Sequence, residues 1–165
     1  MQSDYNKIFK YKDGWLYWKV KINSNKINIG DLAGTASIDG YITVMIDGVR
    51  RQAHLIIWEM HNSSVPNGYT VDHIDRVRYN NKIENLRLAT ITENRYNTDK
   101  SIRNTSGFKG VYFYKNRNKY VAQITFNKKQ KLLGRFDDPR AAAICYNTAA
   151  SLLHGEFACL NSIEK

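Results

Sequence analysis

Asp72 and His73 are adjacent in the sequence, and Asn85 and Asn94 follow them. Carboxylate and amide oxygens are hard ligands that suit a divalent cation, whereas a neutral imidazole accepts a proton near physiological pH. Hydrolysis of a phosphodiester needs an activated water, neutralisation of charge on the phosphoryl oxygens and stabilisation of the departing oxygen. This series of side chains therefore indicates metal-assisted phosphodiester cleavage.

Each member of the series has a hypothetical role. His73 takes the proton from the attacking water, and Asp72 and the amide oxygen of Asn94 bind one divalent ion. Two protein ligands leave coordination positions open for phosphate and water, which is the usual arrangement for Mg²⁺; Mn²⁺ is the other candidate. A lone Asp-His pair in a turn is more often structural than catalytic, so the hypothesis depends on the complete series.

The segment that carries the series has the pattern strand, strand, helix. Residues 69–74 are apolar enough for a strand, residues 75–84 are polar and loop-like, and residues 86–89 can form a second short strand. Thr90 and Glu93 then have the spacing of a capping box, which predicts the start of a helix. That helix carries Asn94.

Taken in order and spacing, Asp72, His73, Asn85 and Asn94 resemble the motif of the HNH endonucleases, in particular the small phage and intron-type homing enzymes with a ββα-metal site. The resemblance implies that His73 and Asn85 are catalytic, with Asn85 holding the loop and orienting the imidazole of His73. It also implies that Asp72 and Asn94 bind the metal and that double-stranded DNA is the substrate.

The chain departs from this family at two places. Relatives usually have an arginine after the histidine that corresponds to His54, but here Leu55 follows, which removes a phosphate clamp. His54 either reaches the active-site region or packs as a structural histidine. After Asp75, the arginines Arg76 and Arg78 stand where relatives carry Gly-Asn and a basic residue, and we expect both to grip the DNA backbone.

For other polar residues near the motif, the sequence leaves a structural role as the favoured interpretation. Asp75 either tunes the metal or forms a turn, and the turn is favoured. Asn97 either contacts phosphate or faces solvent, and solvent is favoured. His61 and His154 are expected to be structural.

The residues before the motif indicate short strands and one helix. Within residues 1–52, the segment 15–20 alternates, and 40–48 is a strand that enters an Asp-Gly turn. The apolar period changes to that of a helix over residues 53–61. Pro and Gly in residues 62–68 end this helix.

A second module is expected after residues 98–107, which lack any apolar period and are predicted to be a linker. Three strands and one helix are predicted, over residues 110–114, 119–126, 131–136 and 140–155. Pro139 at the first turn and Gly155 past the end bound this alanine-rich helix. Its many alanines allow close approach to a sheet.

Gly110-Val111, residues 133–136, the alanine-rich helix and residues 154–158 are similar to the Apetala-two or ethylene-response-factor DNA-binding domain. The resemblance implies that the exposed face of the three-stranded sheet lies in the major groove and that the helix covers the other face. The groove-facing candidates, carried over by motif position, are Lys109, Tyr112, Tyr114, Gln123, Thr125, Gln130 and Leu132.

The composition of this face argues against the GC-rich specificity of the plant domains. Those domains place several arginines there, and arginine reads guanine through two hydrogen bonds, whereas this chain has Tyr, Thr and Gln. Tyrosines can contact phosphates or thymine methyl groups. The alternative is an aromatic sheet surface that packs on the nuclease module. A two-residue period assigns alternate residues of 120–126, beginning with Tyr120, to the core.

Charge and composition favour a folded nucleic-acid-binding protein. The chain has 25 Lys and Arg against 15 Asp and Glu, a net charge of +10, and 42% of its residues are hydrophobic. Residues 101–165 hold 11 basic and 4 acidic residues, so they are the stronger phosphate binder. Solubility alone, or binding to an anionic membrane, is the alternative.

Cofactor and location follow from what the sequence lacks. Cys145 and Cys159 are not part of a Cys-x-x-Cys pair, so no structural zinc is expected beside the Mg²⁺ or Mn²⁺ ion. No apolar stretch approaches the ~18 residues of a membrane span, and no signal segment is recognised. We expect a cytoplasmic protein, in the host cell if phage-encoded, without membrane or small-molecule partners and monomeric by default.

The sequence therefore predicts an α+β fold with two modules. Small N-terminal strands and a ββα-metal nuclease occupy residues 1–97, with the metal-site core at about 69–97. A linker over 98–107 precedes a DNA-binding domain over 108–161, built from a three-stranded antiparallel sheet packed on one helix. A DNA-binding regulator with an idle nuclease site is the first alternative. An RNA-binding protein is the second, although common aromatic RNA-binding motifs are missing.

Overall fold

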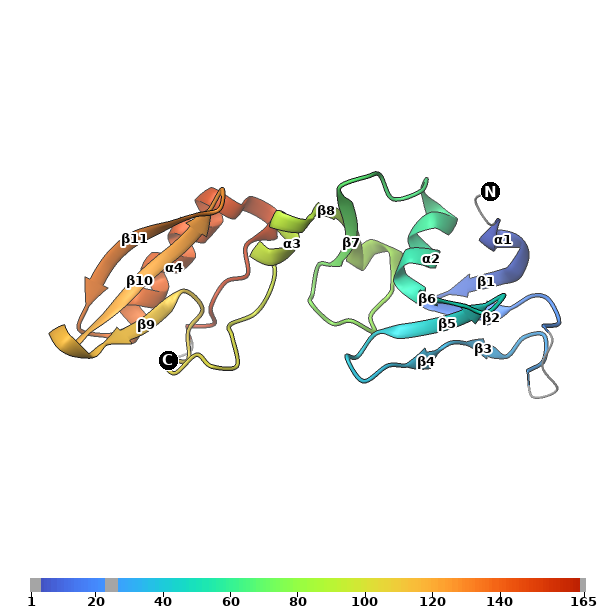
Figure 1. Cartoon of the computed structure of the whole chain (residues 1–165), viewed down its shortest axis with the longest axis horizontal. Helices are drawn as coiled ribbons and strands as arrows, with labels where there is room; N and C mark the ends of the chain where they lie inside the picture. The colour runs from blue at the N-terminus through green and yellow to red at the C-terminus, as the bar shows by residue number, and fades with distance from the viewer. Residues whose placement is uncertain (1–3, 23–26, 164–165) are drawn as a thin grey trace. The chain divides into compact units, whose positions relative to one another are not determined.

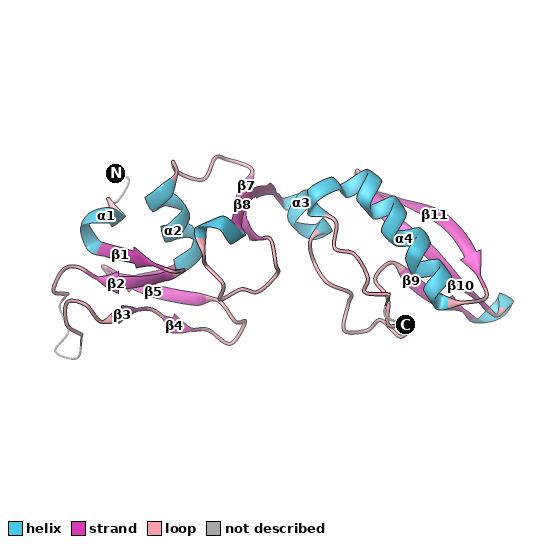
Figure 2. Ribbon diagram, turned by 180° about the vertical axis from the view of Figure 1, so that it is seen from behind, coloured by secondary structure: helices cyan, strands magenta, loops and turns pink. Residues whose placement is uncertain are grey.

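The computed structural model describes residues 4–22 and 27–163, and the chain divides into two compact units, Met1–Ile91 and Thr92–Lys165. Helices and small antiparallel sheets occur in both units, which confirms the α+β class (Figures 1 and 2). The division falls six residues before the expected end of the nuclease module at residue 97. No helix among the described residues is long and apolar enough to cross a membrane.

The described residues of the first unit form three small antiparallel sheets and two helices. One sheet consists of β1 (Phe9–Lys12), β2 (Trp15–Trp18) and β3 (Leu32–Ala33). The second consists of β4 (Thr35–Ala36), β5 (Ile42–Ile46) and β6 (Val49–Gln52), and the third of β7 (Tyr69–His73) and β8 (Leu86–Thr90). The helices are α1 (Tyr5–Ile8) and α2 (Ala53–His61), and Ile83–Asn85 forms a single 3-10 turn, η1.

Alternation in the sequence explains the early strands. Leu16 and Trp18 of β2 point into the core while their neighbours are less buried, and Ile42 and Val44 do the same in β5. The predicted Asp-Gly turn joins β5 to β6, with positive φ at both turn residues, as a two-residue hairpin requires. Helix α1 was not predicted, because it is a single turn whose preceding residue makes no side-chain cap.

Helix α2, predicted over the same residues, supplies the centre of the first core. Ile56 and Ile57 are fully buried, together with Phe9, Leu16 and Val44 from the strands. Figures 1 and 2 show α1 and α2 on the same side of these strands. Burying such side chains stabilises the unit by roughly 1.5–3 kcal/mol each.

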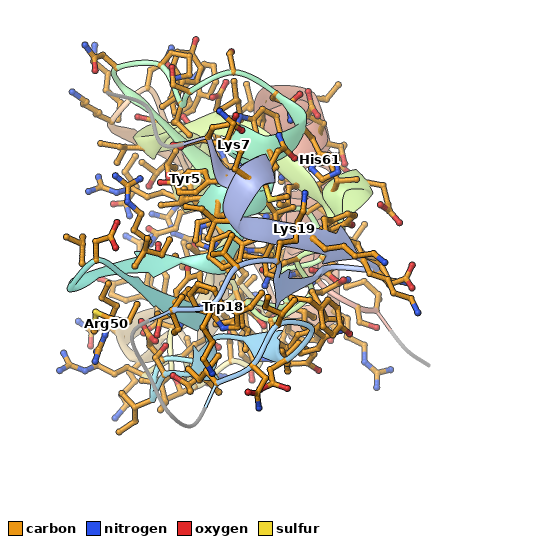
Figure 3. All side chains as sticks on the ribbon, turned by 90° about the vertical axis from the view of Figure 1, so that its right-hand side faces the viewer. Tyr5, Lys7, Trp18, Lys19, Arg50 and His61 are labelled. Atoms are coloured by element: carbon orange, nitrogen blue, oxygen red, sulfur yellow. The ribbon has the colours of Figure 1, made fainter. Side chains whose placement is uncertain are left out.

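Basic side chains lie around the outside of this unit. Lys7 from α1, Lys19 after β2 and Arg50 from β6 are among them (Figure 3). Lys19 Nζ donates to the carbonyl oxygen of Asn6 at 2.7 Å. These charges remain at the surface because desolvating an unpaired ammonium or guanidinium group is costly.

One polar side chain of α2 is buried with this apolar core. His54, in the first turn, is 3% exposed, and its Nδ1 has no hydrogen-bond partner among the described residues. Burial, and to a smaller extent the nearby His73, lowers the pKa of His54 from 6.5 to about 3. The folded protein therefore holds this imidazole neutral.

The second unit is a three-stranded sheet covered on one face by a helix. Its strands are β9 (Val111–Tyr114), β10 (Lys119–Phe126) and β11 (Lys129–Phe136), in the order β11-β10-β9. Helix α4 (Pro139–His154) packs against β10 and β11 (Figures 1 and 2). Nearly all of α3 (Ile91–Tyr96) and the 3-10 turns η2 (Lys115–Arg117) and η3 (Gly155–Phe157) also belong to this unit.

Helix α4 begins and packs as the sequence predicted. The Asp138 carboxylate accepts hydrogen bonds from the backbone N–H groups of Arg140 and Ala141, and Pro139 occupies the first turn. Ala142, Ala143 and Ala150 are fully buried, so the helix backbone comes close to the sheet. Strand β11 begins at Lys129, two residues before the predicted start at residue 131.

Much of the predicted linker is held by hydrogen bonds to the second unit. Asn104 Nδ2 donates to the carbonyl oxygens of Phe108 and Val111, at 2.8 and 3.1 Å. Just before the linker, the ring of Tyr96 stacks on that of His154 at 3.7 Å and 6°. An apolar period cannot reveal these polar and aromatic contacts, and they explain why α3 belongs to the second unit.

We predict that Gly110→Ala destabilises the second unit by about 3 kcal/mol. Gly110 has φ +74, and a Cβ atom there would lie 2.0 Å from Tyr146 Cδ2, so left-handed backbone strain and overpacking act together. Gly107→Ala is the matched control, because φ is +83 but nothing lies within 4 Å of its Cβ position, and it should cost about 1 kcal/mol. Urea unfolding measures both losses. Equal losses would contradict the close packing of Tyr146 on Gly110.

We predict that His54 makes the stability of the protein depend on pH between about 6.5 and 3. In this window the unfolded chain binds a proton that the folded protein does not, so the free energy of unfolding falls as pH falls. Between pH 7 and pH 5 the wild type should lose about 2 kcal/mol more than His54→Gln. Denaturant unfolding at both values measures this, with the exposed His61→Gln as control. The same pH dependence in His54→Gln and the wild type would be the contrary result.

Candidate active site

The antiparallel pair β7 and β8 places the acidic residue of the motif opposite a basic one. Asp72 pairs with Arg87 across the two strands, and His73 pairs with Leu86. Arg87 donates from Nε and Nη2 to Asp72 Oδ2, at 3.1 and 3.0 Å. Both side chains are almost completely buried, so this ion pair fixes the orientation of the Asp72 carboxylate. The sequence analysis did not identify the pair.

His73 ends β7 and is enclosed by three other side chains. Its ring is 4% exposed, and its Nε2 lies 2.8 Å from Oδ1 of Asn81. The rings of His54 and Tyr41 lie 4.9 and 6.0 Å from the His73 ring, between centroids. His54 therefore does reach the active-site region, and it also packs as a buried histidine.

Asn85 holds the loop between β7 and β8. Its Oδ1 accepts from the backbone N–H of Asp75 at 3.1 Å, and its Nδ2 donates to Asp75 Oδ1 and to the carbonyl oxygen of Asn80, at 2.9 and 2.8 Å. These bonds agree with the expectation that Asn85 stabilises the loop. We expected Asn85 to orient the imidazole of His73, but the hydrogen-bond partner of its Nε2 is the amide oxygen of Asn81.

Asp75 has the hydrogen bonds of a turn residue. Its carboxylate accepts from the backbone N–H of Val77 at 2.8 Å and from Nδ2 of Asn80 at 2.6 Å. Burial by itself would raise the pKa of Asp75, but these bonds, the bond from Asn85 and the nearby His73 together lower it. The carboxylate therefore stays ionised and holds the loop closed.

The two loop arginines differ in their surroundings. Arg78 Nη1 donates to the carbonyl oxygen of Asp39 at 2.7 Å, and the guanidinium lies over the ring of Tyr41 at 5.1 Å. This contact directs Arg78 toward its own unit, so we leave it out of the proposed DNA contacts. Arg76 is exposed, with φ +65, and its role in DNA binding stays a prediction.

Two asparagines of the motif region lie in the second unit. Asn94 is half-buried on α3, and its assignment as a metal ligand stays a prediction from the sequence. Asn97 is buried just after α3, so the expectation that it faces solvent is wrong. Within residues 4–22 and 27–163, no three His, Cys, Asp or Glu side chains gather as a ligand set.

The face of the second unit's sheet opposite α4 forms a shallow groove of about 480 Å³. It is lined by Tyr112, Tyr114, Arg117, Val121, Gln123, Gln130, Leu132 and Arg135. Five of the groove-facing candidates are therefore on one surface. Thr125 is exposed further along β10, and Lys109 is not aimed outward, because its Nζ donates to the carbonyl oxygens of Tyr96 and Thr98.

The sequence analysis missed the two arginines of this groove. Strict alternation from Gln130 and Leu132 predicts Gly134 as the next residue on the face. The β10-β11 register instead shifts at Leu133, so that Arg135 pairs with Val121 on the groove face. A β-bulge cannot be read from alternation alone, and Arg117 lies in a turn that has no strand period.

One family model matches the segment of the chain that contains these residues. The family model for the HNH endonuclease matches residues 51–96, which include Asp72, His73, Asn85 and Asn94. The match ends before the sheet of the second unit, so the Apetala-two resemblance stays a prediction. No solved structure is significantly similar to the chain.

Two viral proteins are similar over longer stretches. Protein 3.8 of Escherichia phage T7 is 38% identical over 105 residues, which are 64% of this chain and 86% of that protein. The uncharacterized HNH endonuclease L560 of Acanthamoeba polyphaga mimivirus is 33% identical over 122 residues, 73% of this chain and 63% of that protein. The chain therefore contains an HNH endonuclease domain, over residues 51–96, and this domain makes it a nuclease.

Proposed function

We propose that the protein is a homing-type endonuclease that hydrolyses phosphodiester bonds of double-stranded DNA with a divalent metal ion, guided by its second unit. The observation that carries the proposal is the pair Asp72 and His73 at the end of β7. There, one residue is a carboxylate oriented by Arg87, and the next is an imidazole held by Asn81. Both lie within the HNH family match.

HNH nucleases use divalent metal ions, so such an ion is part of the proposal. Asp72 and Asn94 would hold Mg²⁺ or Mn²⁺, because both ions prefer carboxylate and amide oxygens. When bound, the ion supplies positive charge for the phosphoryl oxygens and the leaving oxygen. Arg87 holds Oδ2 of the Asp72 carboxylate, which restricts how that side chain can turn toward a ligand.

The chain's own residues provide the rest of the chemistry. His73 accepts the proton of the attacking water, because imidazole has a lone pair and a pKa suited to neutral pH. Asn85 does not touch the reacting atoms; it keeps the loop between β7 and β8 closed through Asp75 and Asn80. Positioning of His73 and charge stabilisation at the phosphate then act together.

The second unit is proposed to bind the DNA through its grooved sheet face. Arg117 and Arg135 supply phosphate contacts, and Tyr112 and Tyr114 offer exposed aromatic edges beside them. Gln123 and Gln130 have amide groups that can pair with adenine in the major groove. Residues 101–165 hold 11 basic and 4 acidic residues, and this positive charge supports DNA binding by the second unit.

A DNA-binding regulator with an inactive nuclease site is the competing function. It would need the sheet face but not the buried imidazole or the ion-paired carboxylate. Both of these polar groups are buried, and burying a polar side chain costs free energy that an apolar one would avoid. We therefore favour cleavage over binding alone.

We predict that the purified protein nicks supercoiled plasmid in Mg²⁺ or Mn²⁺, and that His73→Ala lowers the rate at least about 100-fold. Gel separation of supercoiled and open-circle DNA measures the rate. EDTA should abolish the product, and His61→Ala, which removes an exposed histidine from the end of α2, is the matched control. DNA binding without strand breakage would support the regulator and reject the nuclease.

We predict that Arg135→Gln and Arg117→Gln each weaken DNA binding and make its salt dependence less steep. Each lost phosphate contact should change the slope of log affinity against log salt by about 0.9. Fluorescence anisotropy at several salt concentrations measures this. Arg140→Gln, on the helix that covers the opposite face of the sheet, should leave the slope unchanged. A slope unaffected by either groove arginine would argue against this surface.

A further inference from the structure

A cavity of about 360 Å³ lies within the second unit, beside the last residues of β10. Strand β9 pairs with β10 only as far as Ala122, and the backbone N–H of Gln123 then donates to the carbonyl oxygen of Gly110 at 2.8 Å. Beyond this bond, no strand of the described residues covers that edge of β10. The cavity therefore lies where one edge of the sheet is open.

Helix α3 forms one wall of this cavity. Thr92, Arg95 and Tyr96 line it, and they share one face of the helix because residues three and four positions apart are neighbours. Asn94, the proposed metal ligand, does not line the cavity. Lys109 lines it as well, but its Nζ donates to backbone carbonyl oxygens after α3 and so holds the wall together.

The floor of the cavity is apolar, and its opening is cationic. Ile124 and Tyr146 are 2% and 3% exposed and form the floor. Arg95 and Lys128 are exposed at the opening, and within residues 4–22 and 27–163 no carboxylate forms an ion pair with either of them. Such a site suits a ligand that combines a planar, weakly polar ring with an anionic group.

We propose that this cavity binds one nucleotide, with its base against Ile124 and Tyr146 and its phosphate between Arg95 and Lys128. The side-chain amide of Gln123 can donate to or accept from the edge of the base. The volume is near the lower end of the range of roughly 300–1,000 Å³ that is typical of small-molecule pockets. It therefore suits a single nucleotide better than a larger ligand.

Continuity with the sheet groove indicates DNA as the source of the nucleotide. Gln123 and Gln130 line both the groove and the cavity, so the two are joined at these side chains. This choice of source rests on the DNA binding by the second unit that is proposed above. A nucleotide turned out of a duplex exposes its base and phosphate together, and it leaves most easily where the base has no partner.

A peptide strand added to the open edge is the alternative ligand. Two backbone groups of that edge are already bonded within the unit. The carbonyl oxygen of Thr125 accepts from His154 Nε2 at 2.9 Å, and the N–H of Asn127 donates to the hydroxyl oxygen of Tyr96 at 3.3 Å. An added strand would have to displace both bonds, so the edge favours a compact anionic ligand.

The turn that carries Lys128 allows its charge to be separated from its structural role. Asn127 and Lys128 join β10 to β11 with φ +50 and +62, and a two-residue turn of this kind prefers glycine at the second position. A lysine in the left-handed region carries backbone strain that glycine avoids. Lys128→Gly should therefore stabilise the hairpin and at the same time weaken the binding of an anion.

NMR titration of the full-length protein with deoxynucleoside monophosphates tests the cavity. The side-chain amide signals of Gln123 and Gln130 and the backbone signal of Thr125 should shift together, whereas the backbone signal of Gly48 in the first unit should not. Inorganic phosphate should cause smaller shifts, because it lacks the base. Equal shifts with phosphate alone, or no shifts with any nucleotide, would overturn the proposal.

Two neighbouring lysines provide the matched variants. Lys128→Gly should weaken nucleotide binding about 10-fold and raise the urea midpoint of unfolding, because a charge-assisted hydrogen bond and a strained residue are both removed. Lys129→Gln removes the same charge from the next residue, which does not line the cavity, and should leave the affinity unchanged. Equal weakening by both substitutions would indicate general charge attraction and contradict a defined pocket.

Duplex DNA with one unpaired base, compared with the same duplex fully paired, identifies the source of the nucleotide. Fluorescence anisotropy should show about 10-fold tighter binding of the bulged duplex by the wild type, since no base pair must be broken. Lys128→Gly should reduce this preference. Nucleotide binding without any preference for the bulge would keep the pocket, reject DNA as the source and identify a free nucleotide as its ligand.

The same measurements separate this inference from the proposed DNA binding. If nucleotides shift the cavity signals but the protein binds no DNA, the DNA-binding proposal fails and the pocket stands. If paired and bulged duplexes bind equally and no nucleotide shifts the cavity signals, the pocket fails and DNA binding by the groove stands.

Discussion

The antiparallel pairing of β7 with β8 is the constraint on which the candidate site depends. Its register places Asp72 opposite Arg87, so the buried carboxylate is paired with an equally buried guanidinium group. The same pairing brings the end of η1 to the start of the loop. There, Asn85 Oδ1 accepts from the backbone N–H of Asp75, and Asn85 Nδ2 donates to the Asp75 carboxylate. A one-residue slip of one strand would move its side chains to the opposite face and separate Asp72 from Arg87.

Different side chains hold the different polar groups of the site. Asn85 and Asp75 close the loop, Arg87 orients the carboxylate, and Asn81 contacts the imidazole. Each side chain satisfies a different partner, so several separate hydrogen bonds together hold the loop. Such support from neighbouring side chains is what a catalytic constellation needs to stay in its productive geometry.

The second unit presents a polar surface on one face of its three-stranded sheet. Ala142, Ala143 and Ala150 bring α4 close to one face, and the bulge at Leu133 turns Arg135 onto the other. Helix α3 packs on this unit through the ring of Tyr96, although it follows β8 directly in the chain. The helix that carries the motif's last asparagine is thus part of the proposed DNA-binding unit.

Local sequence determined the α+β class, the bounds of α2 and β10, the cap of α4 and the identity of the HNH motif, because periodicity, turn residues and motif spacing are properties of neighbouring positions. Only the tertiary structure decided that Asn81 contacts His73, that Arg87 holds Asp72, and that Asn97 is buried. The first two contacts depend on the register of β7 with β8 and on a glycine turn from the distant N-terminal hairpin. Periodicity along the chain does not encode them, since each forms only when strands, loop and turn have taken their tertiary positions.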